Sequence, residues 1–355
     1  MKKAFNLILA FNLFILAGCS LLPGSTDYSL AEAGPYHVGW QRMILYKDAS
    51  REDRAVYLTL WYPAEISPEA FASEPVVDAA PDRSGAPYPL ILSSSKVGFI
   101  FAQHMVSHGF VVVGLNNHDS KGLWGQWLID YPLDILFALD QVASQPPQGM
   151  EGMIDSGRAG YMGYSFDGYN ALAVSGARVD PEYYLSQCSQ PSPTLPAWWI
   201  EYNCTPASDW EAFAAHAGAD LTTSVDGLWQ PMTDDRIRAV MPMAPEGAWL
   251  FGERGLAAVD RPVLMIGATA DTINPYDQEV SFIYDALGTP ERALISFIDQ
   301  IHGMIDDPEM LARLKHFAAA FFGFQLQGKT DYAGYFSEDF VSRHTGLAWG
   351  VYAGK

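Results

Sequence analysis

Apolar segments alternate with helix-patterned segments along most of this chain. Short runs rich in β-branched and aromatic residues predict strands at 55–63, 89–93, 110–116, 159–164, 237–243, 262–268 and 293–299. Apolar residues at helical spacing predict helices at 99–108, 133–143, 166–176, 278–287 and 308–324. The strand runs lack the alternation of a one-sided sheet, as expected when both faces are covered. This order predicts a doubly wound, mostly parallel α/β sheet.

Two segments fall outside the alternation. Residues 177–236 are rich in Pro, Trp and Tyr, and we interpret them as an insertion that forms a lid over the carboxyl edge of the sheet. The aromatic tail, residues 331–355, is expected to dock on the core. The remaining pattern predicts one α/β domain over residues 36–330, without internal repeats.

The N-terminus has the pattern of an export signal. Two lysines precede a mostly apolar run, and residues 1–18 end in small side chains directly before Cys19. The run is shorter than the about 20 apolar residues that span a bilayer. Residues 19–35 carry no periodicity and are expected to form a tether.

The Leu-Ala-Gly-Cys sequence that ends at Cys19 resembles the lipobox of bacterial lipoproteins. The resemblance implies that Cys19 carries a lipid and becomes the mature N-terminus. It also implies an exported protein anchored to the bacterial cell envelope, at the outer membrane or the cell surface. An ordinary secretory signal is the alternative.

Cys188 and Cys204 lie inside the insertion, on either side of a segment rich in Pro and Trp that we interpret as a loop. An exported protein meets an oxidising compartment, so we predict a disulfide between them. Closing a loop of this size stabilises a fold by roughly 3 kcal/mol in the chain-entropy model. Two free thiols are the alternative. No zinc or other metal site is expected, because no CxxC or paired-His spacing accompanies the two cysteines.

Composition narrows the function classes. Of the 355 residues, 49 % are hydrophobic and only 17 % charged, which excludes a disordered chain. The formal net charge of −20 makes a nucleic-acid partner unfavourable, because such a surface repels phosphates.

The sequence GYSFDG at 163–168 follows a predicted strand and opens a predicted helix. This is the context of a nucleophile elbow, in which a sharp turn lifts a serine above the sheet. We therefore predict Ser165 as the nucleophile. The usual G-x-S-x-G pattern has glycine where this chain has Asp167, and Gly168 comes one residue late.

A nucleophilic serine needs a base, and the base needs an orienting acid. Asp271 and His302 each follow a predicted strand, in the chain order Ser, Asp, His of this fold class. We predict these three as a catalytic triad. Asp299 is a weaker alternative acid, and His108 is expected to cap a helix.

Acyl transfer also needs donors for the developing oxyanion. The backbone N–H of Phe166, directly after the nucleophile, is one candidate. The second is expected from the loop at 94–98, and we predict the backbone N–H of Lys96.

With these residues in place, the chain from Gly39 to Phe324 resembles the dienelactone-hydrolase-like branch of the α/β-hydrolases, which also includes platelet-activating-factor acetylhydrolases. The segments that carry the resemblance are LTLWYPA at 58–64, PLILSSSKVG at 89–98, SHGFVVVGLNNHDS at 107–120, GYSFDG at 163–168 and AAVDRPVLMIGATADTINPY at 257–276. It implies the α/β-hydrolase fold and the same triad of Ser165, Asp271 and His302.

The chain departs from that family at two places. The oxyanion loop usually reads Ser-His-Gly, and here residues 93–95 are three serines. The elbow has Asp167 in place of a glycine. The dienelactone hydrolases proper use a cysteine nucleophile, so their substrate is not carried over to a chain with serine.

Together these features predict a serine esterase that needs no cofactor and acts on a small or apolar acyl ester. Two alternatives remain open: a non-catalytic ligand-binding lipoprotein on a hydrolase scaffold, which the two departures favour, and a serine peptidase of the same fold.

Overall fold

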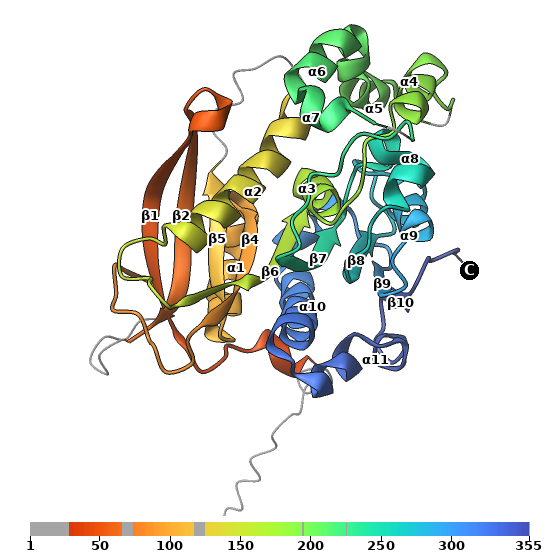
Figure 1. Ribbon diagram of the computed structural model, residues 1–355. Helices are drawn as coiled ribbons and strands as arrows, with labels where there is room; N and C mark the ends of the chain where they lie inside the picture. The colour runs from red at the N-terminus through yellow and green to blue at the C-terminus, as the bar shows by residue number, and fades with distance from the viewer. Residues whose placement is uncertain (1–27, 66–73, 117–124, 194, 225, 355) are drawn as a thin grey trace, which may run out of the picture.

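Ten strands pair into one sheet within the part of the chain that the structure describes (Figure 1). The structure is a computed structural model, and it describes residues 28–65, 74–116, 125–193, 195–224 and 226–354. The strand order is β10-β9-β8-β7-β6-β4-β5-β2-β1-β3. The central strands β5, β4, β6, β7, β8 and β9 run parallel, whereas β1–β2, β2–β5 and β9–β10 pair antiparallel.

The strands are β1 (His37–Asp48), β2 (Arg54–Ala64), β3 (Val76–Val77), β4 (Tyr88–Ser94), β5 (Val111–Asn116), β6 (Ile154–Tyr164), β7 (Ile237–Met243), β8 (Val263–Ala268), β9 (Arg292–Phe297) and β10 (Leu347–Trp349). The helices are α1 (Ser95–Ser107), α2 (Trp127–Ser144), α3 (Phe166–Val174), α4 (Pro181–Ser189), α5 (Ala197–Asn203), α6 (Trp210–Ala217), α7 (Ala219–Thr222), α8 (Ala248–Leu256), α9 (Phe282–Ala286), α10 (Pro308–Gln327) and α11 (Glu338–Ser342). A π-helical turn, Asp277–Ser281, leads into α9.

The sheet is covered by helices on both faces, and this confirms the predicted fold class. One buried cluster packs α2, α3 and α8 against the sheet, and a second packs α1 and α10 against the opposite face. The strands between these layers are mostly buried, and in β8 every residue is buried. Burial on both faces explains why the strand runs show no alternation.

All seven predicted strands are present, and three further strands were not predicted. β1 carries polar residues along its length and a register shift between Gln41 and Ile44, with Met43 at a positive φ of 57°. The irregularity breaks the period-2 pattern that identifies a strand. β3 and β10 contain only two and three residues, too few for a pattern.

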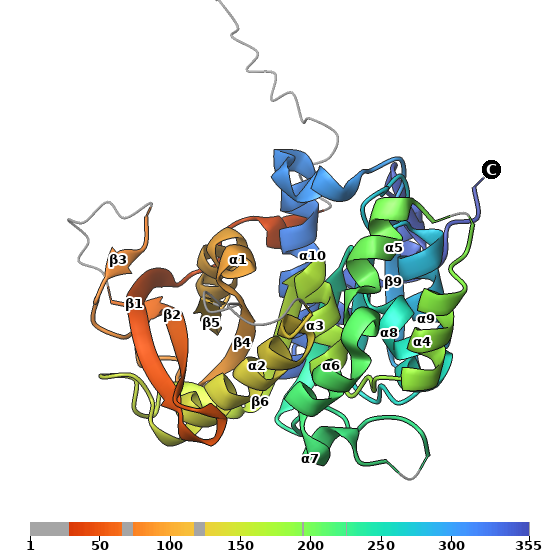
Figure 2. The same ribbon diagram turned by 90° about the horizontal axis from the view of Figure 1, so that it is seen from above.

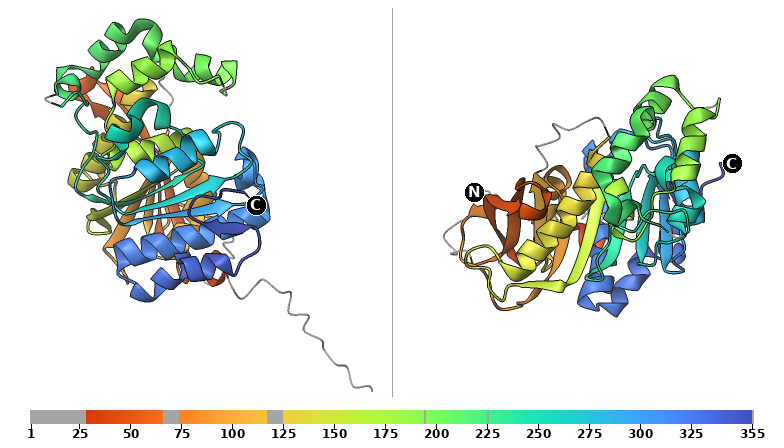
Figure 3. Two further views of the ribbon diagram at one scale, coloured as in Figure 1. Left: turned by 90° about the vertical axis from the view of Figure 1, so that its right-hand side faces the viewer. Right: turned by 45° about the horizontal axis from the view of Figure 1, so that its top comes forward.

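The insertion is mainly helical, so the prediction of an irregular loop between its cysteines was wrong. Helices α4 to α7 lie together at the end of the molecule opposite α10 and α11 (Figure 3). Seen from above, they lie on the other side of the molecule from β1 and β2 (Figure 2). These helices are short, four to nine residues, which hides their periodicity in the sequence, and prolines mark the starts of α4 and α5.

Cys188 and Cys204 form a disulfide with their Cα atoms 5.4 Å apart, as predicted. It joins the end of α4 to the residue that ends α5. The disulfide thus links two helices within the insertion. It also contacts the main domain through His216, whose Nε2 lies 3.0 Å from Oδ1 of Asp130 in α2.

Both ends of the described chain pack on the domain. Residues 28–35, expected to belong to a tether, instead contact α1 and α10: Leu30 N donates to His316 Nδ1 (3.2 Å) and Gly34 N donates to Ser107 Oγ (2.9 Å). At the other end, Phe340 and Val341 of the aromatic tail are buried, and β10 extends the sheet beside β9. The predicted export signal at 1–18 and the predicted lipid site Cys19 lie outside the described residues. Among the helices that are described, none is long and apolar enough to cross a bilayer.

A buried ion pair ties the antiparallel edge of the sheet to α2. Arg54 in β2 contacts both carboxylate oxygens of Asp134, at 2.8 and 2.9 Å, and Asp134 is 2 % exposed. We expect Asp134→Ala to lower the free energy of unfolding by about 3–5 kcal/mol, because it leaves the guanidinium without its buried partner. Urea unfolding measures this change.

The matched control is Asp140→Ala in the same helix. Asp140 pairs with Arg236, but its side chain is 64 % exposed, so its loss should cost less than about 1 kcal/mol. Equal losses for the two variants would contradict the stabilising role given to burial.

Candidate active site

Ser165 occupies a strained turn between β6 and α3. Its backbone has φ 62° and ψ −123°, a combination that costs a non-glycine residue on the order of 1–3 kcal/mol. The turn is held by hydrogen bonds on both sides: Ser165 N donates to Met243 O (2.9 Å), and Gly168 N donates to Ser165 O (2.7 Å). This is the geometry predicted from the strand-turn-helix pattern.

Two glycines allow this turn. A Cβ on Gly163 would lie 1.9 Å from the carbonyl oxygen of Asp167, and a Cβ on Gly168 would lie 2.7 Å from Cα of Pro245. Both distances are shorter than real contacts, so only glycine fits. Gly168 therefore allows α3 to pack closely on Pro245 in the loop after β7, although this glycine comes one residue late in the motif.

The structure brings the three predicted triad residues together. His302 Nε2 lies 2.8 Å from Ser165 Oγ, and His302 Nδ1 lies 2.7 Å from Asp271 Oδ2. Ser165 follows β6, Asp271 follows β8 and His302 follows β9, so parallel strands of one sheet deliver all three residues to the same edge.

Asp271 is held rigidly. Its side chain has no exposed surface, and its Oδ1 accepts hydrogen bonds from the backbone N–H groups of Ile273 (2.8 Å) and Asn274 (3.0 Å). Asn274 in turn donates from Nδ2 to Ala244 O (2.9 Å), in the loop that follows β7. One carboxylate oxygen is thus fixed by the turn and the other is left to orient the imidazole.

Tyr164 contacts His302 through a hydrogen bond and through its ring. Its hydroxyl donates to the carbonyl oxygen of His302 at 2.5 Å, and the two rings meet edge to face with centroids 5.6 Å apart. Neither of the supporting residues Tyr164 and Asn274 was predicted from the sequence. Their roles depend on contacts between distant segments of the chain: Tyr164 and His302 are 138 residues apart, and Asn274 and Ala244 are 30 residues apart.

The two candidate oxyanion donors lie in the first turns of two helices. Phe166 is the first residue of α3, and Lys96 is the second residue of α1. Helix α1 begins at Ser95 and not at Phe99, so the predicted loop is already helical there. First-turn N–H groups have no partner within their own helix, which leaves both backbone donors available for a ligand.

The two departures from the family pattern contact each other. The Ser94 hydroxyl donates a short hydrogen bond to Asp167 Oδ2, and Asn170 Nδ2 donates to Asp167 Oδ1 (3.2 Å). Burial raises the pKa of Asp167 to about 6, against the opposing effects of these two hydrogen bonds and of the Lys96 charge. Asp167 therefore points toward α1 and forms part of the junction between the two helices.

The other His and Asp residues that follow predicted elements have different roles. His108 is the C-cap residue of α1, as expected, and its backbone N–H donates to Met105 O (3.1 Å). Its Nε2 lies 3.0 Å from Glu32 O, outside the helix. Asp299 is exposed, and its backbone N donates to Thr269 Oγ1 (2.8 Å). Asp307 caps α10 through the N–H groups of Glu309 and Met310.

Aromatic side chains extend from the nucleophile to the insertion. Phe166 contacts Tyr131 and Trp127 of α2 edge to face, with centroids 5.7 and 6.3 Å apart. Trp127 stacks at 6.4 Å on Tyr202 of α5. Within the insertion, Trp198 is 48 % exposed and Trp199 is buried. Trp124, His118 and Asp119 lie outside the described residues.

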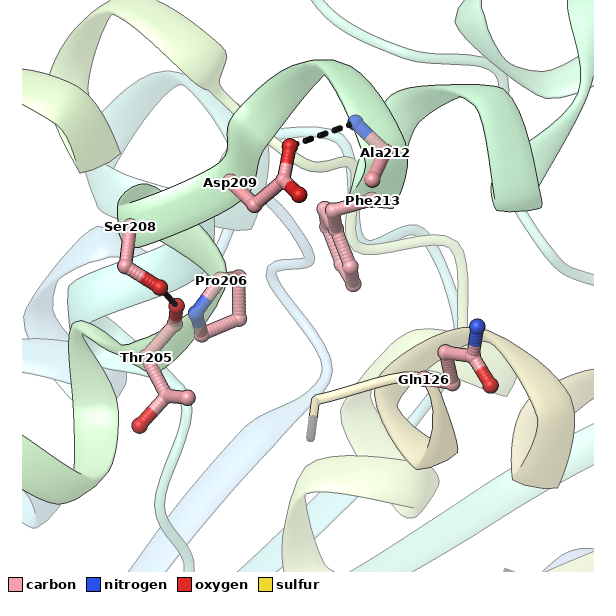
Figure 4. A pocket seen from close by; sticks show the side chains of 7 residues that line it. All are labelled: Gln126, Thr205, Pro206, Ser208, Asp209, Ala212 and Phe213. Atoms are coloured by element: carbon pink, nitrogen blue, oxygen red, sulfur yellow. Dashed lines mark hydrogen bonds between the residues drawn. The ribbon is translucent and has the colours of Figure 1, made fainter. Parts of the chain in front are cut away.

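A small cavity of about 120 Å³ lies where α2 meets the insertion, and Figure 4 shows its lining. Asp209 at its edge accepts a hydrogen bond from Ala212 N (3.2 Å) and caps α6. The lining residues are Gln126, Thr205, Pro206, Ser208, Asp209, Ala212 and Phe213. None of the triad residues lines this cavity.

Two further carboxyl groups are buried near the elbow. Glu279 Oε2 accepts hydrogen bonds from Gly247 N and Ala248 N, both 2.9 Å, at the start of α8. Burial raises the pKa of Glu279 well above its usual value. Glu246 adjoins Pro245, the residue that faces Gly168, and burial together with the charge of Asp167 raises its pKa to about 8.

No protein-family model matches this sequence, and no curated protein matches it. Within the described residues, no group of three or more His, Cys, Asp and Glu side chains is arranged to hold a metal ion. The functional assignment therefore depends on the geometry of Ser165, Asp271 and His302.

Glu246 makes a pH-dependent contribution to stability. In the unfolded chain a glutamate has a pKa of about 4.3, whereas burial and the charge of Asp167 raise the pKa of Glu246 in the folded protein to about 8. The folded protein therefore holds a proton that the unfolded chain releases between these two values, and stability falls as the pH rises through that window. We expect Glu246→Gln to be more stable than the wild type at about pH 9, by a few kcal/mol, and similar to it at about pH 4.

Urea unfolding at both pH values measures this difference. Glu182→Gln is the matched control, because the side chain of Glu182 is 88 % exposed and its removal should not change the pH dependence. A Glu246→Gln variant with the same pH dependence as the wild type would contradict the expectation.

Proposed function

We propose that this protein is a serine esterase that cleaves small or apolar acyl esters through an acyl-enzyme. The observation that supports the proposal is the continuous hydrogen-bonded series from Ser165 through His302 to Asp271, with contacts of 2.8 and 2.7 Å. The sequence resemblance to the dienelactone-hydrolase-like branch of the α/β-hydrolases is consistent with it.

In the acylation step, Ser165 Oγ attacks the ester carbonyl carbon while His302 Nε2 takes the hydroxyl proton. The carbonyl oxygen becomes negatively charged and is stabilised by the backbone N–H groups of Phe166 and Lys96. Asp271 accepts from Nδ1 and stabilises the imidazolium. The carbon–oxygen bond to the leaving alcohol then breaks, and His302 passes its proton to that alcohol.

In the deacylation step, His302 removes a proton from water, and the resulting hydroxide attacks the acyl carbon. The acid leaves as Ser165 regains its proton from the imidazolium. Net consumption is one water for each ester. The aromatic side chains of Phe166, Trp127 and Tyr202 provide apolar surface near the nucleophile, which favours an acyl or aromatic substrate group.

We also propose that the protein is exported and attached to the bacterial cell envelope through a lipid on Cys19. The export pattern of residues 1–18 supports this proposal, and so does the disulfide between Cys188 and Cys204, since such bonds persist in oxidising compartments.

Ser165→Ala should reduce turnover of p-nitrophenyl acetate on the order of 10³-fold or more. The remaining rate is the one that substrate binding and the oxyanion donors support without the nucleophile. Alanine leaves the turn and its backbone hydrogen bonds in place, so circular dichroism and the melting temperature should change little. Steady-state kinetics measure the loss.

Ser175→Ala is the matched control, because Ser175 lies at the other end of α3 and its hydroxyl donates to Leu172 O. A Ser165→Ala variant that keeps the wild-type rate would contradict the proposal. Faster release of amines from peptides than of alcohols from esters would replace the esterase with a peptidase.

Cys19→Ser should abolish incorporation of labelled palmitate into the protein expressed in a bacterial host, because the thiol that would carry the lipid is removed. Gel fluorography of the membrane fraction measures it, with Cys204→Ser as the control that keeps the label. Equal labelling of the Cys19→Ser variant would contradict the anchor.

A further inference from the structure

The first turns of α1 and α3 are joined by side chains. Ser94 is the N-cap of α1: its Oγ accepts from Val97 N (3.3 Å) and donates to Asp167 Oδ2. Asp167 lies in the first turn of α3, two residues after Ser165. The same hydroxyl therefore closes the first turn of one helix and binds the first turn of the other.

The Asp167 end of this junction is itself anchored. Asn170, one turn along α3, donates from Nδ2 to Asp167 Oδ1 and has no exposed surface. Gly163 and Gly168 fix the backbone on either side, since the Asp167 carbonyl packs directly over Gly163 and Gly168 faces Pro245. Movement of the Asp167 carboxyl is thus confined, and Ser94 is held against a fixed point.

We propose that the Ser94–Asp167 hydrogen bond is a positioning clamp that sets the distance between the two oxyanion donors, Lys96 N–H on α1 and Phe166 N–H on α3. The inference rests on the proposed esterase function. Lys96 is two residues after Ser94, and Phe166 directly precedes Asp167, so the clamp joins the two turns at the points nearest the donors. Ser94 and Asp167 act through these turns and not on the substrate.

The clamp gives a specific kinetic signature. Losing one oxyanion donor costs about 10²–10³ in kcat, and misplacing a catalytic group by roughly 1 Å can cost about 10²-fold. We therefore expect Ser94→Ala and Asp167→Ala each to lower kcat by about 10- to 100-fold. KM should change little, because the charge on the carbonyl oxygen is full only in the transition state.

The test is a double-mutant cycle on p-nitrophenyl acetate. Because both variants break the same bond, the double variant should lose no more kcat than the worse single variant, whereas independent effects would multiply. Ser94→Thr keeps the hydroxyl and Asp167→Asn keeps an acceptor oxygen, so each should restore kcat close to the wild type. The rate of Ser165 phosphonylation should fall in parallel, since the phosphoryl oxygen needs the same donors.

A purely structural role for these side chains would lower the melting temperature of both variants and leave kcat unchanged. Ser175→Ala and Asp209→Asn are matched controls, the second at the cap of α6, and both should keep the wild-type kcat. If the wild type is active but the single variants keep the wild-type kcat, the clamp alone is overturned. The same holds if the losses of kcat in the two single variants multiply in the double variant. A wild type that turns over no ester and is not labelled at Ser165 overturns the esterase and the clamp together.

Discussion

The first turn of α3 packs so closely on β6 and on the loop after β7 that residues 163 and 168 can only be glycine. The carbonyl of Asp167 lies over Gly163, and Pro245 lies against Gly168. This packing forces the residue at the apex, Ser165, into a positive φ and lifts its hydroxyl above the sheet. The rest of the site depends on it, because a relaxed turn would let Ser165 fall back from His302.

The parallel sheet supplies the second element of the site. Strands β6, β8 and β9 end at the same edge, and the residues that follow them, Ser165, Asp271 and His302, meet there in a hydrogen-bonded line. Hydrogen bonds from one loop to another then hold each member in place: Asn274 joins the acid loop to the loop after β7, and Tyr164 joins the serine strand to the histidine loop. The arrangement of the three residues therefore depends on contacts between their loops as well as on the three side chains themselves.

Most of the central fold could be predicted from sequence, because fully buried parallel strands leave long apolar runs that stand out between helices. The residues of the candidate triad could be predicted for the same reason, since each one comes soon after such a run. Strand β1, with its irregularity at Met43, and the short helices of the insertion could not be predicted, because irregular backbone and brief elements leave no period. The contact between Ser94 and Asp167 could not be predicted either, since it joins residues 73 positions apart.

The most direct test of the account is labelling of the purified chain from residue 20 onward with a fluorophosphonate, followed by mass spectrometry of the modified peptide. The account predicts a single adduct on Ser165 in the wild type and none in His302→Ala, because only the hydrogen-bonded imidazole activates the hydroxyl. A folded wild-type protein without the adduct, or an adduct formed equally in His302→Ala, would contradict it.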